Sequence, residues 1–567
     1  MVALSGESRT DATSVPAPRW VARSLVLNEG RDPLGFQTMT QDRLMPVLLP
    51  GILELSRRAR YFSFHAFLLD EYRKRRLPAD GTSLSVFIKR CEWDLGLAVQ
   101  RCPSGCGSSP VGARRLGGQA AGPGPFPRGE SVESAFGGYG LYYRSPMVVL
   151  GVVAKSGTLL GDQPIPIDVL YRTERAARLV EGFRSAVEET AYYRRWMWTD
   201  EDLPAEVVGE YAAAACLCRL RERTGERDAV HDALFGTDPP DTHSAARQSA
   251  PASEGDAIAG VEFSEAGAMQ RRRSVGHYLT LVDAHPEVVY SEAAYREALW
   301  SPPTVRTSAH ALVADQWAAL IAKDVWQEAI CSLWSEYCRA GLARTRDLGR
   351  GLTWDETREM AAGMVDGLPS LDRDQPTSNL IAALADNRLS VADADGAVVD
   401  VTTTSLEALR DLTARLDTAT SGLIVLLELA RRAGKRSGTG WLQAAHIASA
   451  WQPSIAALFG ELSSHLEGSP SVGETLWWLV SRFVIPVHER IAYSKLPEFT
   501  FRFRWEDGLL RFYDHGVGRF PLAAIRNEPF ASLTRDLGMW DIEMAEGGRR
   551  AILTGRGAAF VEEVLRD

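Results

Sequence analysis

Cysteine is the residue type in this chain whose spacing first suggests chemistry. Cys102 and Cys106 stand in CPSGCG, where glycine lets backbone amides turn toward thiolates, as in one half of a zinc site. Such a site needs four ligands, and either Cys91 or the pair Cys216 and Cys218 could complete it. No C-x-x-C spacing is repeated and no H-x-x-x-H spacing lies nearby. Two interpretations stay open: zinc bound at Cys102 and Cys106, or free thiols in a loop and no cofactor.

Arginine followed by histidine a few residues later is a second pattern with chemical meaning. Arg272 precedes His277 in this way, and Arg482 precedes His488. In this pattern the chain resembles HEPN-type ribonucleases. The resemblance implies that the guanidinium steadies a phosphate while the imidazole moves protons to and from a 2′-hydroxyl, without a metal. Pro486 lies between the second pair and should kink its helix, and an arginine-rich chain also produces such pairs by chance.

Residues 499–513 predict a β-hairpin. FTFRFRW alternates apolar and polar residues, and Asp507-Gly508 is a strong two-residue turn signal. With that turn, Trp505 pairs with Leu510 and Arg504 with Arg511. The polar face would then carry Arg502, Arg504, Arg511 and Tyr513. This face either contacts phosphate or an acidic protein, or is a solvated face balanced by Glu506 or a neighbouring helix.

The last fifty residues predict the order helix, helix, strand, turn, strand, helix. The two helices come from PLAAIRN and PFASLTRDLG, and the strands from MWDIEM and RAILT. From Leu533 to ILTGRG this segment resembles a winged-helix module. The resemblance implies contacts to DNA from Arg535 on the second helix and from Arg549 and Arg550 at the wing. Many modules of this shape bind proteins instead, so the partner stays open.

Most of the remaining chain predicts α-helix. The segment Ile52 to Leu77 should be one buried aromatic helix around His65. The segment Ala309 to Ala343 should be the longest helix, with Trp317, Trp326 and Trp334 packed in a core. The expected fold class is a mainly α, multi-module protein that ends in a small α+β unit.

Composition divides the chain into modules. Residues 102–140 and 236–260 are so rich in Gly, Pro and Ser that they predict a long loop and a linker. The expected modules are a disordered leader at 1–30, helical modules at 31–140, 141–235 and 261–345, a helical bundle at 346–496, and the hairpin with the winged-helix-like segment at 497–567.

Charge and motifs narrow the function. A net charge of -10 excludes a polyanion-binding surface over the whole molecule, but leaves local basic patches. Nucleotide-binding and hydrolase motifs are absent from the sequence.

We find no secretory signal and no apolar run that could span a bilayer, so we expect a cytoplasmic protein. The excess of arginine over lysine suggests a bacterial source. The expected function is that of a subunit of a nucleic-acid-handling assembly, which binds a partner protein, DNA or RNA rather than acting as an enzyme. The alternatives are a metal-independent HEPN-like ribonuclease that uses an arginine–histidine pair, and a purely structural helical scaffold.

Overall fold

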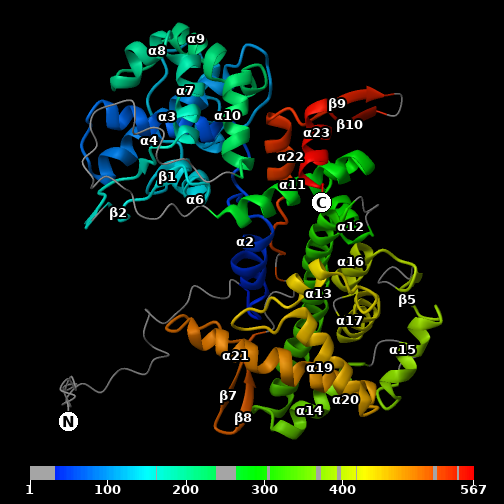
Figure 1. The fold of residues 1–567 in the computed structure, drawn as a ribbon. Helices are drawn as coiled ribbons and strands as arrows, with labels where there is room; N and C mark the ends of the chain where they lie inside the picture. The colour runs from blue at the N-terminus through cyan, green and yellow to red at the C-terminus, as the bar shows by residue number, and fades with distance from the viewer. Residues whose placement is uncertain are drawn as a thin grey trace, which may run out of the picture. The chain divides into compact units, whose positions relative to one another are not determined.

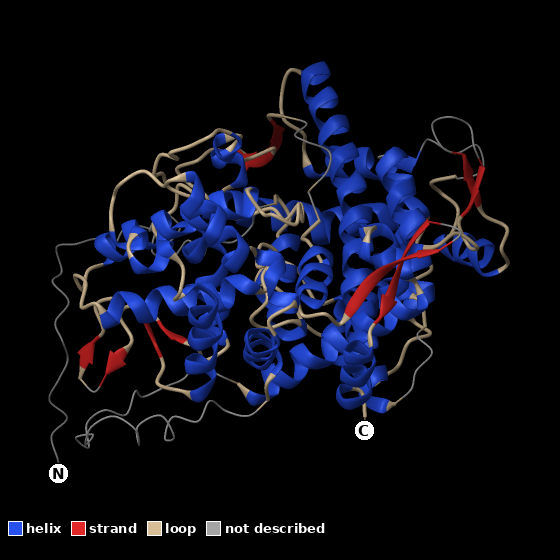
Figure 2. Cartoon of the chain, turned by 90° about the horizontal axis from the view of Figure 1, so that it is seen from above, coloured by secondary structure: helices blue, strands red, loops and turns tan. Residues whose placement is uncertain are grey.

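The computed structural model confirms a mainly helical fold with only short two-stranded sheets (Figure 2). It describes residues 32–160, 162–237, 264–302, 307–365, 372–392, 398–416, 418–514, 520, 522–545 and 548–566. The predicted leader at 1–30 and most of the predicted linker at 236–260 lie outside the described residues. No helix in the described part of the chain is both long enough and apolar enough to cross a membrane.

The chain forms two compact units (Figure 1). Unit 1 comprises Met1–Leu44 and Asp315–Ala523, and unit 2 comprises Met45–Ala314 and Ala524–Asp567. The residues of the predicted 497–567 module divide between them, because the hairpin belongs to unit 1 and the last helices and strands belong to unit 2.

Within its described residues, unit 1 consists of helices and four short strands. Its helical segments are α1 (Phe36–Thr38), the π-helical turn η3 (Met39–Leu44), α13 (Ser308–Leu348) from Asp315 onward, α14 (Trp354–Ala362), η10 (Gly363–Val365), α15 (Thr377–Ala385), α16 (Leu406–Leu416), α17 (Ala419–Ala433), α18 (Thr439–Ala445), α19 (Ile455–Glu467), α20 (Val472–Leu479), the π-helical turn η11 (Val480–Val484) and α21 (Ile485–Ser494). Its strands are β5 (Ser390–Ala392), β6 (Val398–Asp400), β7 (Phe503–Glu506) and β8 (Leu509–Phe512).

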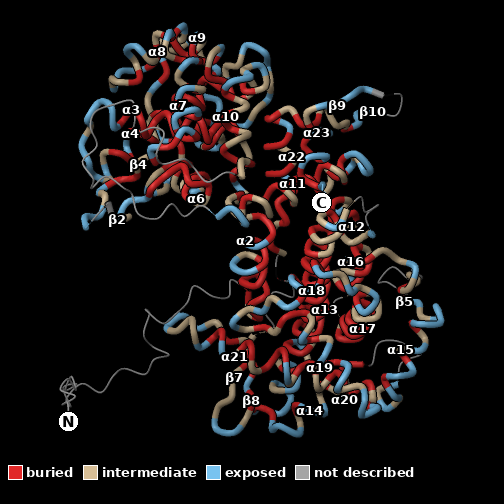
Figure 3. The backbone as a smooth tube through the Cα atoms, in the orientation of Figure 1, coloured by how far each residue is buried: buried red, intermediate tan, exposed pale blue. Residues whose placement is uncertain are grey.

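Helix α13 is the centre of unit 1, as its sequence predicts. Trp317, Trp326 and Trp334 are fully buried, and Figure 3 shows much of the helix in the buried colour. The aromatic ring of Phe36 meets Trp326 edge-on with centroids 4.8 Å apart. These tryptophans are therefore core residues rather than a ligand-binding surface.

The predicted hairpin forms with the predicted register. Trp505 pairs with Leu510 and Arg504 with Arg511 across β7 and β8. Asp507 and Gly508 both have positive φ, 52° and 77°, as the tight turn requires. The apolar side of the hairpin packs on α13, where Phe503 lies 5.5 Å from the Trp334 ring.

The other helical segments of the described residues belong to unit 2. They are α2 (Met45–Leu48), α3 (Arg60–Lys74), α4 (Gly81–Gln100), α5 (Ala113–Leu116), η4 (Gln119–Ala121), η5 (Tyr139–Tyr143), α6 (Arg144–Val149), α7 (Glu174–Val187), α8 (Ala191–Arg194), η6 (Trp196–Trp198), α9 (Ala205–Ala215), the 3-10 turn η7 (Leu217–Arg221), α10 (Thr224–Phe235), α11 (Glu265–Ala284), η9 (Pro286–Val289), α12 (Glu292–Trp300), α22 (Asn527–Asp536) and α23 (Gly555–Val564). Its antiparallel strand pairs are β1 (Val153–Ala154) with β4 (Val169–Leu170), β2 (Leu159–Leu160) with β3 (Gln163–Pro164), and β9 (Trp540–Ala545) with β10 (Gly548–Leu553).

Two details of the predicted helices are corrected. The aromatic helix α3 spans Arg60–Lys74 rather than Ile52 to Leu77. Near the C-terminus α22 forms, but residues 522–526 are not helical, and Arg526, with φ 64°, separates them from α22. Around Pro486 the α-helix is interrupted, since the π-helical turn η11 directly precedes α21.

Candidate metal centre

Four cysteines from two distant segments meet in unit 2. Cys102 and Cys106 follow α4, and Cys216 and Cys218 follow α9, which packs against α4. All four Sγ atoms lie within 4.8 Å of one another. The Sγ–Sγ distances are 3.6 Å for Cys102 and Cys218, 3.6 Å for Cys106 and Cys216, and 3.5 Å for Cys216 and Cys218. We call this set the four-cysteine cluster.

The first segment of the four-cysteine cluster is a tight turn after α4. The Cys102 amide still donates to Val99 O at 3.2 Å, and Gly105 N then donates to Cys102 O at 3.0 Å. Gly105 and Gly107 have φ 55° and 64°, a conformation that side-chain-bearing residues rarely adopt. These glycines let the chain reverse on both sides of Cys106, so both thiols face the same way.

The second segment is held by a buried ion pair. The amide of Arg219 donates to Cys216 O, which begins the turn η7. Arg60 is fully buried, and its guanidinium donates to Cys216 O at 2.6 Å and to Ala214 O at 3.1 Å. The same guanidinium makes a bidentate pair with Glu226 at 2.9 Å on both sides. Because the fork of arginine is planar and rigid, it fixes the carbonyl groups on either side of Ala215 and so positions the two following thiols.

The pKa values of Cys102, Cys216 and Cys218 are shifted in different directions. Burial raises the pKa of Cys102, but hydrogen bonds from the Cys106 amide, the Cys216 thiol and the Ser104 amide outweigh burial and lower that pKa to about 6. Burial raises the pKa of Cys218 to about 12 and also raises the pKa of Cys216. Both segments follow the C-terminal end of a helix, where the helix dipole disfavours negative charge. A cation at the centre would offset this cost for all four sulfur atoms.

The spacing of the sulfur atoms fits tetrahedral zinc. Zinc–thiolate bonds of about 2.3 Å in a tetrahedron place sulfur atoms roughly 3.8 Å apart. Three of the six Sγ–Sγ distances are 3.5 to 3.6 Å, close to this value, and all six are no longer than 4.8 Å. They are far longer than the roughly 2.05 Å of a disulfide. Four thiolates suit zinc better than the hard cations magnesium or calcium.

Between the two completions that the sequence left open, the structure brings Cys216 and Cys218 to Cys102 and Cys106. Cys91 is buried elsewhere in α4, where burial raises the pKa of its thiol to about 12. Cys331 and Cys338 are buried in α13 of unit 1. Within the described part of the chain, no other group of three or more Cys, His, Asp or Glu side chains lies close enough together to share a metal ion.

Arg58 links the four-cysteine cluster to the C-terminal segment. Ser108 Oγ lies 3.3 Å from Cys106 Sγ and accepts a hydrogen bond from Arg58 Nη2 at 3.0 Å. The same Arg58 Nη2 is 3.2 Å from Asp536 Oδ1 at the end of α22, and Asp536 Oδ2 accepts from the Ala59 amide at 3.1 Å. The start of α3 therefore contacts both halves of the four-cysteine cluster and α22.

In each of the two arginine–histidine pairs, the arginine and the histidine contact different partners. Arg272 pairs with Glu563 at 2.5 Å, whereas His277 is buried with its Nδ1 3.1 Å from His310 Nε2. Burial lowers the pKa of His277, as does the nearby His310, to about 3, so it is neutral at pH 7.

The second pair is separated in the same way. Arg482 pairs with Glu461 at 2.9 Å on the surface, while His488 is buried and its Nε2 accepts from the Arg502 amide at 3.0 Å. In both pairs, therefore, the arginine is engaged with a carboxylate and the histidine is buried.

The arginines of the hairpin each have a carboxylate nearby. Arg504 forms an ion pair with Glu506, Arg511 lies 3.6 Å from Glu506, and Arg502 pairs with Asp514 at 2.5 Å. Tyr513 is 38% exposed beside them. Two carboxylates therefore lie among three arginines: Glu506 is shared by Arg504 and Arg511, and Asp514 pairs with Arg502.

The arginines of α22 and β10 are placed differently. Arg549 and Arg550 are exposed on β10, opposite Met544 and Glu543 of β9, and neither has an ion pair within the described residues. Met544 is 73% exposed. Arg535 is exposed on α22 and lies over the Trp540 ring at 5.5 Å.

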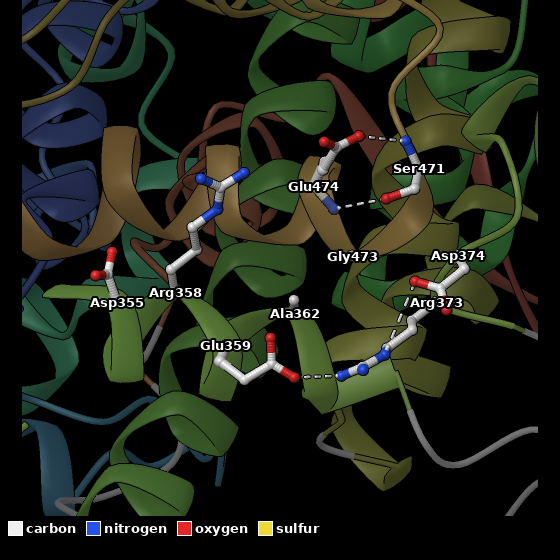
Figure 4. Close-up of a pocket in the computed structure, with 9 residues that line it drawn as sticks. All are labelled: Asp355, Arg358, Glu359, Ala362, Arg373, Asp374, Ser471, Gly473 and Glu474. Atoms are coloured by element: carbon white, nitrogen blue, oxygen red, sulfur yellow. Dashed lines mark hydrogen bonds and ion pairs between the residues drawn. The ribbon is translucent and has the colours of Figure 1, made fainter.

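Unit 1 contains a separate surface hollow of about 530 Å³ beside α14 and α20 (Figure 4). Its lining is mostly charged: Asp355, Arg358, Glu359, Ala362, Arg373, Asp374, Ser471, Gly473 and Glu474. Arg373 pairs with Glu359 at 2.8 Å, and Glu474 caps α20 through Ser471. Glu359 and Glu474 are thus engaged in structural contacts, and within the described residues the hollow holds no group of side chains close enough together to share a metal ion.

Comparison of the chain with protein-family models, with curated proteins and with solved structures found no match.

Sequence reasoning named Cys102 and Cys106 and left Cys91 or the pair Cys216 and Cys218 as alternative completions, but it did not find the residues that position the cluster. The C-x-x-x-C and C-x-C spacings were visible, whereas the contribution of Arg60, Glu226 and Ser108 was not. Arg60 and Glu226 are 166 positions apart, and no short-range pattern relates them.

Proposed function

We propose that this protein binds one zinc ion through Cys102, Cys106, Cys216 and Cys218, and that the zinc braces a helical unit whose role is to bind a macromolecule. The observation that carries the proposal is the convergence of four Sγ atoms within 4.8 Å. Two segments more than a hundred residues apart supply two thiols each.

The ligand set supports a structural role for the zinc. Catalytic zinc keeps one coordination position open for water or substrate, whereas four protein ligands fill the tetrahedron. Zinc here would therefore cross-link the turn after α4 to the turn after α9. The protein then acts through its surface rather than through chemistry at the metal.

Zinc content tests this proposal directly. Protein purified under reducing conditions should contain one zinc per chain, and Cys218→Ser should bring the content close to zero because three thiolates hold zinc far more weakly than four. Elemental analysis of the desalted protein measures this. Cys338→Ala is the matched control, because Cys338 lies in α13 of unit 1 outside the four-cysteine cluster. Zinc near zero in the parent chain even after zinc is supplied would refute the site.

The exposed arginines of β10 support nucleic acid as the macromolecule. Arg549 and Arg550 lie without ion pairs in the described structure, beside the exposed Met544. Glu543 stands opposite Arg550 in the strand pair but forms no ion pair with it, so either arginine can contact a phosphate without first breaking an internal ion pair. We therefore propose β9 and β10, together with Arg535 on α22, as the contact surface, and a partner protein is the alternative occupant.

The salt dependence of binding separates these occupants. If β10 contacts phosphates, the logarithm of the affinity for labelled duplex DNA should fall linearly with the logarithm of salt concentration, and each lost phosphate contact should reduce the slope by about 0.9. Arg549→Ala combined with Arg550→Ala should show this reduction. Arg504→Ala combined with Arg511→Ala is the matched control, since both of these arginines contact Glu506, whereas Arg549 and Arg550 form no ion pair within the described residues. No binding at low salt would exclude nucleic acid and leave the partner protein.

A further inference from the structure

We infer that the four-cysteine cluster is also a site of reversible oxidation, at which hydrogen peroxide converts the four cysteines into two disulfides that join the two segments and zinc is released. This inference rests on the proposed zinc site and adds a covalent modification to it.

Two Sγ–Sγ contacts of 3.6 Å join the two segments, and a third, of 3.5 Å, lies within the second segment. Cys102 and Cys218 are 3.6 Å apart, and Cys106 and Cys216 are also 3.6 Å apart. These two pairs use every thiol of the cluster once. Each sulfur needs to move by less than an ångström or so toward its partner to reach a disulfide length of about 2.05 Å. The competing bond between Cys216 and Cys218 would close a ring around a single residue, which is strained.

Access favours this cluster over the other cysteines. Cys102, Cys106 and Cys218 are partly exposed. Open space adjoins the first segment, since side-chain carbons added at Gly105 or Gly107 would meet no atom within 4 Å. Cys91, Cys331 and Cys338 are buried to 1% exposure or less. Peroxide therefore reaches the cluster while the remaining thiols stay protected.

The reaction balances with peroxide as the oxidant. In each disulfide, two thiolates lose two electrons to one hydrogen peroxide, whose O–O bond breaks, and two protons from solvent complete two water molecules. Two peroxides and four protons therefore consume the four thiolates of one cluster. Zinc leaves as Zn²⁺, because the thiolate and not the disulfide is its ligand.

The pairing across the segments makes the change reversible. Both disulfides tie the turn after α4 to the turn after α9, so the ligands stay together while the metal is absent. A thiol reductant would return four thiolates to the same place. Disulfides confined to one segment would instead leave the two turns untethered.

Peroxide titration of the zinc-loaded full-length protein tests the inference. A chromogenic chelator should report one zinc released for every two disulfides formed. Peptide mapping by mass spectrometry should find Cys102 joined to Cys218 and Cys106 joined to Cys216, with Cys91, Cys331 and Cys338 still reduced. Dithiothreitol followed by zinc should restore the original zinc content.

Three outcomes would overturn the inference. These are zinc retained in excess peroxide, oxidation of the cluster to sulfinic or sulfonic acids that dithiothreitol does not reverse, and disulfides within one segment only. Each presupposes bound zinc at the start. A chain that takes up no zinc under reducing conditions refutes the proposed function instead, so the two failures are distinguishable. Cys106→Ser provides a second measurement, because peroxide should then yield only the disulfide between Cys102 and Cys218.

Discussion

At the scale of single residues, burial decides the charge state of several groups that sequence patterns leave ambiguous. His65 in α3 is 1% exposed among aromatic rings. The Nε2 atom of His65 lies 3.6 Å from Glu92 Oε1, but this oxygen accepts a hydrogen bond from the Tyr139 amide at 2.6 Å. Burial therefore has the larger effect and lowers the pKa of His65 to about 3. This imidazole is therefore a neutral core residue at physiological pH.

The buried imidazole predicts a loss of stability in acid. The unfolded chain protonates His65 below pH 6.5 and the folded chain only near pH 3, so the free energy of unfolding falls as pH drops below 6.5. Between pH 6.5 and 4.5 this residue should remove about 2–3 kcal/mol. His65→Phe should remove that part of the pH dependence in urea unfolding curves measured across this range.

Replacement of His285, which lies on the surface, is the control for the loss of an imidazole. An unchanged pH dependence in His65→Phe would show that His65 is not neutral in the folded protein.

At the scale of elements, packing against neighbours determines what a helix contributes. α13 has tryptophans around its circumference, and its partners come from segments as distant as Phe36 and Phe503. In the same unit Trp354 begins α14, where it is 46% exposed beside Trp477. The same residue type is therefore a core residue in one helix and a surface residue in another.

This contrast predicts unequal costs of truncation. Trp326→Ala should lower the free energy of unfolding by about 3–5 kcal/mol, because a fully buried tryptophan leaves a cavity. Trp354→Ala should cost much less, since nearly half of its surface already contacts water. Chemical denaturation measures both, and equal costs would contradict the burial of α13.

At the scale of the whole molecule, the four-cysteine cluster belongs entirely to unit 2. The contacts of Arg58 and Arg60 connect it to α3, α10 and α22 of the same unit. The stabilising effect of zinc should therefore be confined to unit 2.

Zinc removal tests this confinement. If free zinc is present at 100 times its dissociation constant, its removal should cost unit 2 about 2.7 kcal/mol. Hydrogen exchange after treatment with a zinc chelator should increase in the segments around Cys102 and Cys216, and then in α22. The amides of α13 from Asp315 onward should stay protected, and a uniform increase across both units would contradict the expectation.

The sequence by itself determined the features that depend on neighbours along the chain. The hairpin at Phe503 to Phe512 forms with its predicted register because Asp507-Gly508 and the alternation act locally. The long helix α13 likewise follows from its own composition and pattern, and ends before Gly349, which has φ 66°. The mainly helical fold class follows from many such segments.

Only the tertiary structure decided which distant residues meet. From the sequence, the candidate site at Cys102 and Cys106 could have been completed by Cys91, by Cys216 with Cys218, or by no residue. The packing of α4 against α9 brings Cys216 and Cys218 to it. Arg502 was visible as a charge on the hairpin, but its pairing with Asp514 depends on how the chain continues beyond β8. The physical reason is that a zinc ligand set and an ion pair depend on distances in space, whereas periodicity and turn signals carry information over only a few residues of chain.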